Sequence, residues 1–411
     1  MPTAKHSLSR LERGSLASGR AAIHCGGMRA SNGFDLFVNP GFGTPGTVVL
    51  PEAGFRRANS EIRSWPGYAV TPLRDLAELA AQYGIGCLRM KDEASRFGLG
   101  SFKSLGGAYA VGVAVADALA RAGIAANATM TELEAGRWAA TTAAITVTCA
   151  TDGNHGRSVA WGAQRFGAKC VIFVHEGVSR GRIDAIAAYG AEIRVVAGNY
   201  DDSVREAASV AAASGWLVIS DTSWDGYSET PRQVMQGYRV MVDEALAGWT
   251  GAPPTHVFIQ GGVGGVAAAV SVHLRAHCQP LPKLVVVEPE AAACLLASAR
   301  AGQPVVVPGD LDTLMAGLAC GEPSPLAWAE LGRAGFAFMA IPDAAAVAAM
   351  RTLAGLGIVA GESGVAGLAG LALVAADPAG RAELGLSSDS RVLVFSTEGA
   401  TDPALYARLI A

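Results

Sequence analysis

The sequence predicts an α/β fold with a mostly parallel sheet, and three observations lead to it: the order of its apolar segments, its composition and its length. Eight short runs rich in β-branched residues alternate with segments of helical period. Near-continuous apolar strands separated by helices are typical of a parallel sheet that helices cover on both faces. Hydrophobic residues make up 51% of the 411 residues and charged residues 17%, so we expect most segments to be buried on more than one side.

The strands are predicted from apolar runs that end in polar or glycine-rich residues. We expect them at residues 87–91, 144–149, 170–175, 191–196, 216–220, 255–260, 283–288 and 391–396. Helix starts follow the capping rule, because a side-chain oxygen can accept a hydrogen bond from the first free amides of a helix. On this rule Ser101, Ser179 and Asp201 each precede a helix that a glycine closes.

The chain is expected to form two joined domains. The strands between residues 144 and 220 are closely spaced and can form a sheet of their own. We therefore expect a small domain at 144–221 and a large domain that combines 34–143 with 222–411. Residues 1–33 are expected to be a disordered N-terminal extension, since the first 27 residues have no helical period and no signal-like apolar core.

Composition excludes several classes of partner. The formal net charge is −4 and no basic block occurs, so neither nucleic acid nor an anionic membrane is expected to bind. The longest stretch without Asp, Glu, Lys or Arg, 245–274, contains Pro253, Pro254 and six glycines, which favours a buried strand, loop and helix over a membrane span. Seven scattered cysteines indicate free thiols in a reducing compartment, hence a cytoplasmic protein with a small-molecule partner.

A glycine-rich loop follows the sixth predicted strand. Residues 261–265 read Gly-Gly-Val-Gly-Gly and precede an alanine-rich run. Backbone N–H groups at such a strand-to-helix turn can approach an anion, so the loop is a candidate phosphate cradle. Gly262, Gly264 and Ala267 also satisfy the dinucleotide fingerprint, and Glu288 ends the next strand, which leaves a nicotinamide enzyme as an alternative. A tight turn without a ligand is the simplest other interpretation.

Two further polar segments follow predicted strands. Residues 151–156 read Thr-Asp-Gly-Asn-His-Gly, and residues 396–399 read Ser-Thr-Glu-Gly. Ligands of open α/β sheets bind at the carboxyl ends of the strands, where these groups would meet. The first segment suits a carboxylate or phosphate, although Asp152 or Asn154 can also serve as a helix cap. The second offers hydroxyls to a ring nitrogen, although a capped turn explains it as well.

Lys103 is unusual because the chain uses arginine 27 times and lysine five times. It lies in the small, apolar segment SFKSLGG at the start of a predicted helix. The positive end of a helix and desolvation both disfavour the ammonium form, and a neutral amine is the nucleophile that forms Schiff bases. Arginine cannot replace it in this chemistry. A Schiff-base lysine, a phosphate cradle and polar loops together indicate pyridoxal phosphate, although Lys103 alone is also explained as a surface lysine.

Five segments in this order resemble one enzyme family. They are SFKSLGGAYA, TDGNHGRSVAW, QGGVGGVAAAV, AGLACGEPS and STEGATDP. Together they resemble the diaminopropionate ammonia-lyases, which belong to the tryptophan synthase β-like (fold type II) pyridoxal phosphate enzymes. The resemblance runs from about Phe34 to the C-terminus. It implies two open, twisted, mostly parallel sheets covered by helices, an active site between large and small domains, and elimination of both nitrogens of 2,3-diaminopropionate as ammonia to give pyruvate.

The resemblance also assigns a cofactor site. It implies that Lys103 binds pyridoxal 5'-phosphate as a Schiff base, that Asn154 contacts the ring hydroxyl and that Ser396 contacts the pyridine nitrogen. The implied phosphate-binding residues are Gly261, Gly262, Val263, Gly264 and Gly265. The implied substrate-carboxylate loop comprises Thr151, Asp152, Gly153 and His155. No metal site is expected, because the pair His273 and His277 has no carboxylate ligand following it on its helix.

Asp152 and Asp221 are the candidate catalytic acids beside Lys103. Related dehydratases and racemases commonly have a serine or small residue at the place of Asp152, and in racemases that serine is the base opposite the lysine. With Lys103 on one face and Asp152 on the other, the α-proton of either enantiomer can be removed, which predicts activity on D- and L-substrate. Asp221, in the segment DTSWDGY, matches an acid of the family and would hold the distal ammonium of the substrate.

Three alternatives remain open. The first is a serine or threonine dehydratase on the same fold, and the second is the nicotinamide dehydrogenase. The third is a non-catalytic metabolite-binding or partner-interaction protein that retains the fold. A largely apolar chain of this fold also favours a homodimer.

Overall fold

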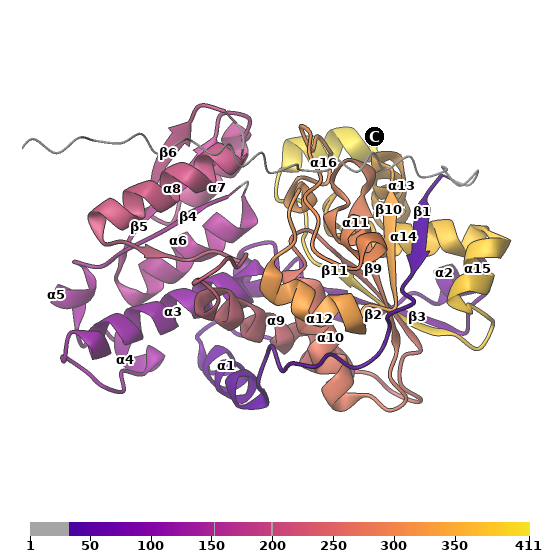
Figure 1. Ribbon diagram of the computed structural model, residues 1–411, viewed down its shortest axis with the longest axis horizontal. Coiled ribbons are helices and arrows are strands. Elements are labelled where there is room, and N and C mark those ends of the chain that lie inside the picture. The colour runs from indigo at the N-terminus through magenta and orange to yellow at the C-terminus, as the bar shows by residue number, and fades with distance from the viewer. Residues whose placement is uncertain (1–32, 152, 199) are drawn as a thin grey trace, which may run out of the picture.

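The computed structural model describes residues 33–411, apart from residues 152 and 199. The fold is α/β, with a smaller and a larger sheet in the two halves of the molecule (Figure 1). Of the predicted N-terminal extension at 1–33, all but Gly33 lies outside the described residues. The domain boundaries stay a proposal, although the strands of each sheet come from one of the two proposed domains.

The larger sheet has seven strands in the order β1-β10-β9-β8-β11-β3-β2. Its inner strands are parallel, whereas β1 and β2 pair antiparallel at the two edges. Antiparallel edges on an otherwise parallel sheet are common in α/β folds. The bounds are β1 Asp35–Val38, β2 Leu73–Asp75, β3 Cys87–Asp92, β8 His256–Gln260, β9 Lys283–Pro289, β10 Ala337–Ile341 and β11 Arg391–Ser396.

Alternate side chains of the larger sheet face two hydrophobic layers. On β8, Val257 and Ile259 belong to one layer and Phe258 to the other, as the two-residue period of a strand requires. The helices of the first layer are α1 Glu52–Ser64, α9 Glu229–Ala247, α10 Gly265–His277, α11 Cys294–Ala301 and α12 Pro325–Ala334. Those of the second are α2 Ala77–Gln82, α13 Asp343–Gly355, α14 Ala366–Ala376, α15 Pro378–Leu384 and α16 Pro403–Ile410.

The smaller sheet has four parallel strands in the order β6-β5-β4-β7. Their bounds are β4 Thr146–Ala150, β5 Lys169–His175, β6 Glu192–Val196 and β7 Leu217–Val218. Phe173 of β5 faces the side of α8 Tyr200–Ser214, and Ile172 faces the opposite side. The helices of that opposite side are α3 Lys103–Arg121, α6 Asn154–Phe166 and α7 Arg180–Ala187. The remaining short elements are α4 Met130–Glu134, α5 Ala139–Thr142 and the 3-10 turns η1 Arg96–Gly98, η2 Glu290–Ala292 and η3 Ala316–Leu318.

All eight predicted strands are present, whereas the edge strands β1 and β2 and the inner strand β10 were not predicted. One capping prediction is confirmed, because the Oγ of Ser179 accepts a hydrogen bond from the Arg182 amide at 3.4 Å at the start of α7. The other two are wrong. Helix α3 begins at Lys103 without a side-chain cap, since Ser101 instead forms a β-bridge with a C-terminal residue. Helix α8 already begins one residue before Asp201.

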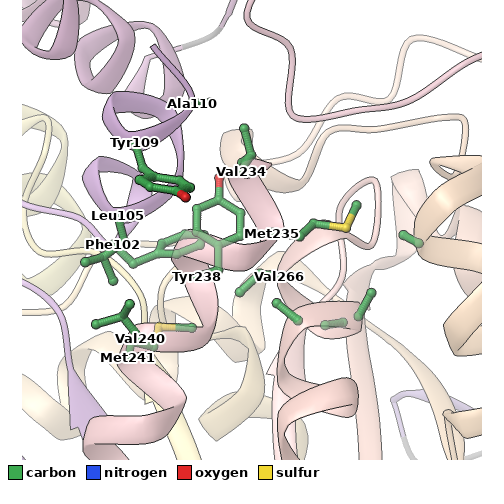
Figure 2. Close-up of a cluster of buried hydrophobic side chains, with 14 of the residues drawn as sticks. Phe102, Leu105, Tyr109, Ala110, Val234, Met235, Tyr238, Val240, Met241 and Val266 are labelled. Carbon is green, nitrogen blue, oxygen red and sulfur yellow. The ribbon is translucent and has the colours of Figure 1, made fainter. Parts of the chain in front are cut away.

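Helices α3 and α9 cross unusually closely below the first turn of α3. A Cβ atom at Gly237 of α9 would lie 1.9 Å from the carbonyl oxygen of Leu105 in α3, so this crossing requires glycine. The aromatic and aliphatic side chains around the crossing are drawn in Figure 2, and the rings of Phe102 and Tyr238 are 4.6 Å apart. Such close packing leaves the first turn of α3 little freedom, and therefore fixes the base of Lys103.

Within the described part of the chain, no helix is both long and apolar enough to cross a bilayer. The uncharged stretch at 245–274 contains the end of α9, strand β8 and most of α10. Pro253 and Pro254 lie in the connection between α9 and β8, as their effect on helices and strands predicts.

Candidate active site

Most of the predicted site residues line one pocket, which is formed by residues of both sheet regions. Its walls include the first turn of α3, the segment after β4, the loop between β8 and α10, and the segment after β11. These segments follow the carboxyl ends of parallel strands, where ligands of open α/β sheets bind. The predicted residues that line it are Lys103, Thr151, Gly153, Asn154, His155, Asp221, Gly261, Gly262, Val263 and Gly265.

Three predicted site residues stand apart from this group. Gly264 belongs to the glycine loop and Ser396 ends β11, but neither lines the pocket. Ser396 is 1% exposed, and its Oγ lies 3.5 Å from the carbonyl oxygen of Glu398. Asp152 lies outside the described residues, so its role stays a prediction from the sequence.

Lys103 reaches from the start of α3 to Asp221, which follows β7. Its Nζ donates a hydrogen bond to Oδ2 of Asp221 at 2.6 Å, and the two side chains are 21% and 15% exposed. The amine also lies 5.4 Å from the ring centre of Phe102 and 5.7 Å from that of Tyr238. A carboxylate and two aromatic rings therefore surround it, and water screens the ion pair only in part.

The predicted lowering of the Lys103 pKa is wrong for the free amine. Burial does lower the pKa of Lys103, but the negative charge of Asp221 outweighs it and holds this pKa well above its usual range. Burial likewise raises the pKa of Asp221, but the neighbouring imidazole of His155 and the ammonium of Lys103 outweigh it and hold that pKa well below its usual range. No local pattern indicates this pairing, because the two residues are 118 positions apart.

His155 lies beside this ion pair at the start of α6. Its Nε2 is 2.7 Å from the carbonyl oxygen of Ile219, and its Nδ1 is 3.8 Å from Oδ2 of Asp221. A carbonyl can only accept, so Nε2 carries the proton and Nδ1 is the acceptor of a neutral ring. Burial lowers the pKa of His155, which favours that neutral form. Nδ1 is buried and has no hydrogen-bond partner among the described residues, so it is placed to accept a proton.

The loop from Gly261 to Gly265 has the geometry of an anion cradle. Gly262 and Gly264 have φ angles of +61° and +94°, which residues with a side chain rarely adopt. A Cβ atom at Gly261 would lie 2.6 Å from Cγ of Glu288. The first amides of α10 have no acceptor within the helix, and Gly261, Gly262 and Gly265 line the pocket. This arrangement suits a phosphate group at the N-terminus of α10.

Glu288 is not the ribose-binding acid that the dinucleotide fingerprint requires. It is fully buried, and its carboxylate accepts hydrogen bonds from the amides of Leu295 and Leu296 at 2.9 and 2.8 Å. These amides belong to the first turn of α11, so Glu288 stabilises the start of that helix. Burial raises the pKa of Glu288 to about 8. Because Glu288 does not line the pocket, the nicotinamide alternative lacks the acid that would bind the ribose.

Glu398 is a pocket residue whose role the sequence did not indicate. It is 5% exposed and connects two sides of the pocket. Its Oε1 accepts a hydrogen bond from the amide of Ser363 at 2.9 Å, and its Oε2 accepts one from Nδ2 of Asn154. Asn154, which is predicted to contact the cofactor ring, is therefore oriented by an acid from the larger-sheet side. The segment STEG contains Glu398, but the prediction assigned Ser396 because of its hydroxyl group.

Two further lining residues belong to none of the quoted segments. Arg182 comes from α7, and its guanidinium donates to Oε1 of Glu362 at 2.7 Å. Tyr238 comes from α9 and faces the amine of Lys103. Both lie in ordinary amphipathic helices, so no local pattern marks them and only the packing of distant segments brings them to the pocket.

The pocket fits a ligand that carries an aldehyde, an aromatic ring and a phosphate. The amine of Lys103 can capture the aldehyde once it has lost its proton, and the amides of 261–265 suit the phosphate. Asn154 lies in the same pocket and offers an amide group to a ring substituent. Pyridoxal phosphate has these three parts, so the residues present fit the cofactor that the sequence indicates.

Comparison with known proteins agrees with this chemistry. The family model of pyridoxal-phosphate dependent enzymes matches residues 64–398. Diaminopropionate ammonia-lyase of Escherichia coli (strain K12) is 40% identical over 391 residues, which cover 92% of this chain and 96% of that protein. Crystal structures of the Escherichia coli enzyme in complex with D-serine and with an aminoacrylate-PLP azomethine reaction intermediate match with TM-scores of 0.82 and 0.80. Each is 36% identical and covers 92% of this chain, and the matches span 96% and 97% of those chains.

The similarity to threonine dehydratases is more limited. The biosynthetic L-threonine dehydratase of Salmonella typhimurium (strain LT2) is 30% identical over 162 residues, which cover 39% of this chain and 30% of that protein. The processed form of threonine deaminase isoform 2 from Solanum lycopersicum matches with a TM-score of 0.69 at 20% identity, over 93% of this chain and 97% of that one. At that identity the match shows a common fold alone.

Proposed function

Because the chain belongs to the family of pyridoxal-phosphate dependent enzymes, and within it to the diaminopropionate ammonia-lyases, we infer that it converts 2,3-diaminopropionate and water to pyruvate and two molecules of ammonia. The enzyme is a carbon-nitrogen lyase whose cofactor is pyridoxal 5'-phosphate. The observation that carries this function is the meeting in one pocket of Lys103, residues of the glycine loop and residues of the polar segment after β4. They are Lys103, Gly261, Gly262, Val263, Gly265, Thr151, Gly153, Asn154 and His155. Each of the three segments contributes a group that this reaction needs.

The cofactor would be held by residues from four segments. When bound, it supplies an electron sink for the substrate carbon that loses its proton. We assign its aldehyde to the amine of Lys103 and its phosphate to the amides of 261–265. Asn154 is assigned to the ring hydroxyl, and its fixed hydrogen bond to Glu398 supports this by holding the side chain in place. Ser396 remains our assignment for the pyridine nitrogen.

The substrate carboxylate is assigned to the loop 151–155. The hydroxyl oxygen of Thr151 accepts hydrogen bonds from the amides of Gly153 and Gly156 at 3.0 and 3.1 Å. Its oxygen is thereby fixed and its proton is free to be donated. A carboxylate is the natural acceptor for such a proton at the start of a helix, where the backbone also favours negative charge. Gly153 and His155 complete this loop.

Two bases would remove the α-proton, one for each enantiomer. Lys103 acts as a base from one face of the substrate, and Asp152 is assigned to the other. An ammonium cannot act as a base, so Lys103 must first lose the proton that Asp221 stabilises. Nδ1 of His155 lies 3.8 Å from the Asp221 carboxylate and has no hydrogen-bond partner among the described residues, so we assign it as an acceptor for this proton.

Asp221 is assigned to the distal amine, which leaves as ammonia. Its carboxylate binds the ammonium of Lys103 at 2.6 Å, so it is shaped to accept a hydrogen bond from a primary ammonium group. When Lys103 no longer offers an ammonium, the charge of Asp221 can bind that of the substrate instead. After the loss of the first ammonia, the enamine released into water hydrolyses to pyruvate and the second ammonia.

We further propose that the protein is a cytoplasmic homodimer that acts on a small amino acid. The six cysteines of the described residues form no disulfide with one another, which supports a reducing compartment. The apolar composition of the chain supports self-association.

The test of the function is pyruvate formation from each enantiomer by the enzyme loaded with cofactor. We expect turnover of both D- and L-diaminopropionate. Asp152→Asn should lower kcat/KM for the D-substrate by about 10²-fold or more and for the L-substrate by less than about tenfold, because a base is lost from one face. A coupled pyruvate assay measures both.

Serine is the control substrate, because a hydroxyl replaces its distal amine. Faster pyruvate formation from serine than from diaminopropionate would favour the dehydratase alternative. An equal loss on both enantiomers in Asp152→Asn would contradict the two-face assignment and leave the lyase itself standing. Bound cofactor without turnover of either enantiomer would contradict the function.

A further inference from the structure

Three side-chain contacts join the two sides of the pocket. They are Arg182–Glu362, Ser179–Asp402 and Asn154–Glu398. In each contact the donor belongs to a helix start beside the smaller sheet, and the acid belongs to the C-terminal part of the chain beside the larger sheet. We call these three contacts the clasp. They are side-chain contacts, so the two sheets are joined here by groups whose charge can change.

Glu362 is the acid of the clasp with the most buried surroundings. Its side chain is 4% exposed, and that of Arg182 is 16% exposed. Its neighbours in sequence are both tied to Glu398: the amide of Gly361 donates to the Glu398 carbonyl at 3.0 Å, and the amide of Ser363 donates to Oε1 at 2.9 Å. A shift of Glu362 would therefore be felt at Glu398, which holds Asn154.

We propose that Glu362 is a positioning residue of the ammonia-lyase: through its ion pair with Arg182 it keeps the smaller-sheet side closed on the pocket. Arg182 itself lines the pocket and lies next to Gly153 at the start of α6, since a Cβ atom at Gly153 would meet its Cδ at 3.4 Å. Loss of the pair would allow the start of α6 to move away from the cofactor. The proposal rests on the function proposed above, because closure matters only if a ligand is enclosed.

The charge of Glu362 changes with pH near neutrality. The groups that face it are Arg182 from α7, Glu398 after β11 and Asp402 at the start of α16. Burial and then the charge of Glu398 raise the pKa of Glu362 to about 7, although Arg182 lowers it in part. A carboxyl group with a raised pKa is charged above that value, so the ion pair is complete in mildly alkaline solution and weakens as the pH falls.

The experiment compares Glu362→Gln with the wild-type holoenzyme in two measurements. The first is the rate of cofactor release, followed by absorbance after dilution at about pH 8. We expect release about tenfold faster in the variant, because its neutral amide cannot pair with a guanidinium. The second is kcat/KM for diaminopropionate between about pH 6 and about pH 8. The wild type should gain about tenfold over this range as one acid ionises, and the variant should lose this rise.

Arg180→Gln is the matched control. Arg180 lies on the same helix and pairs with Asp184 at 2.8 Å, with side chains that are 84% and 56% exposed. That surface pair does not reach the larger sheet, so its loss should leave both measurements unchanged within about twofold. If Glu362→Gln does not fold, Arg182→Gln breaks the same pair from its other end. The variant that combines both substitutions should be no worse than either alone.

The outcomes separate this proposal from the function. Cofactor release and a pH profile that match those of Arg180→Gln would overturn the clasp. Faster cofactor release in Glu362→Gln, without diaminopropionate turnover in the wild type, would support the clasp and overturn the function. Additive effects of the Arg182 and Glu362 substitutions would also overturn the proposal, since residues that act through one ion pair cannot be independent.

Discussion

Lys91 and Lys103 are two lysines of the same chain that meet carboxylates in opposite surroundings. Lys91, in β3, is fully buried, and its Nζ donates to the Thr71 carbonyl at 2.6 Å and to Oε2 of Glu244 at 2.5 Å. Lys103 lines a pocket and has Asp221 as its acidic partner. Both amines are withdrawn from bulk water, yet only the second faces space that a ligand can enter.

The two pKa shifts run against the expectation that a catalytic lysine is the one with the lowered pKa. Burial lowers the pKa of Lys91 in spite of Glu93 and Glu244, whereas Asp221 raises the pKa of Lys103 in spite of burial. The pKa of the resting amine therefore does not identify the reactive lysine. Position separates the two lysines: Lys91 is fully buried among its partners, whereas Lys103, the lysine that we propose is reactive, lines the pocket and pairs with Asp221.

The largest expected effect is that of Lys103→Ala. It should lower kcat/KM for diaminopropionate by about 10⁴-fold or more and abolish the absorbance of the covalently bound cofactor, because no other described lysine reaches the pocket. The free energy of unfolding in urea should fall less than in Lys91→Met, because the side chain of Lys103 is 21% exposed whereas Lys91 is fully buried. Lys91→Met is the contrasting variant, and it should lose stability without losing the absorbance. If Lys103→Ala retained the absorbance of the covalently bound cofactor, Lys103 would not be the lysine that binds it.

The next effect concerns stability rather than chemistry. Glu244 accepts hydrogen bonds from Lys91 and from the guanidinium of Arg96 at 2.9 and 2.6 Å, and all three side chains are buried. Glu244→Gln removes the carboxylate charge that neutralises the buried cations Lys91 and Arg96. We therefore expect the free energy of unfolding to fall by about 3–5 kcal/mol. The folded variant should keep its kcat, because none of these residues lines the pocket.

This effect should also depend on pH in a defined direction. Burial raises the pKa of Glu244, but Arg96 and Lys91 outweigh it and lower it from 4.5 to about 2. A carboxylate with a lowered pKa stabilises the fold above its ordinary pKa and loses that contribution as the pH falls. The difference between wild type and Glu244→Gln in urea unfolding should therefore shrink in acid below about pH 4. A difference that stays constant would contradict the buried ion network.

Asp221→Asn should lower turnover less than Lys103→Ala does, but it should change the pKa of the Lys103 amine. We expect about 10²-fold lower kcat/KM, and a lower pKa of Lys103 because its stabilising charge is gone. The apoenzyme should then capture the cofactor aldehyde at lower pH than the wild type does. Stopped-flow absorbance over a series of pH values measures this. Asp225→Asn, an exposed neighbour in the same segment, is the control, and an identical pH dependence in both variants would contradict the role of Asp221.

The parallel core and the pocket segments could be predicted because their signals are local. The apolar runs of β8 and β9 reflect burial on both faces, and the glycine loop between β8 and α10 reflects a tight strand-to-helix turn with positive φ angles. The edge strands β1 and β2 could not be predicted, since each has four residues or fewer and is buried on one side at most. Strand β10 lies in an alanine-rich region where strand and helix patterns look alike.

The partners of the site residues could not be predicted, because they depend on contacts between distant segments. Lys103 and the loop 151–155 have local signatures, but the pairing of Lys103 with Asp221 inverted the expected shift in its pKa. Glu398 and Arg182 are equally dependent on the meeting of the two sheets. Sequence reasoning therefore named residues that the structure brings to one pocket, including Lys103 and Asp221, but it did not predict that these two would pair.

The crossing of α3 and α9 has a consequence for redesign of this enzyme. Even a methyl group at Gly237 would overlap the Leu105 backbone and displace the first turn of α3, which carries Lys103. A position outside the pocket therefore determines where the amine of Lys103 lies. Mutant libraries that vary only pocket residues would not change the effect of Gly237 on the position of Lys103. In random mutagenesis, substitutions at Gly237 should be tolerated as poorly as substitutions at Lys103.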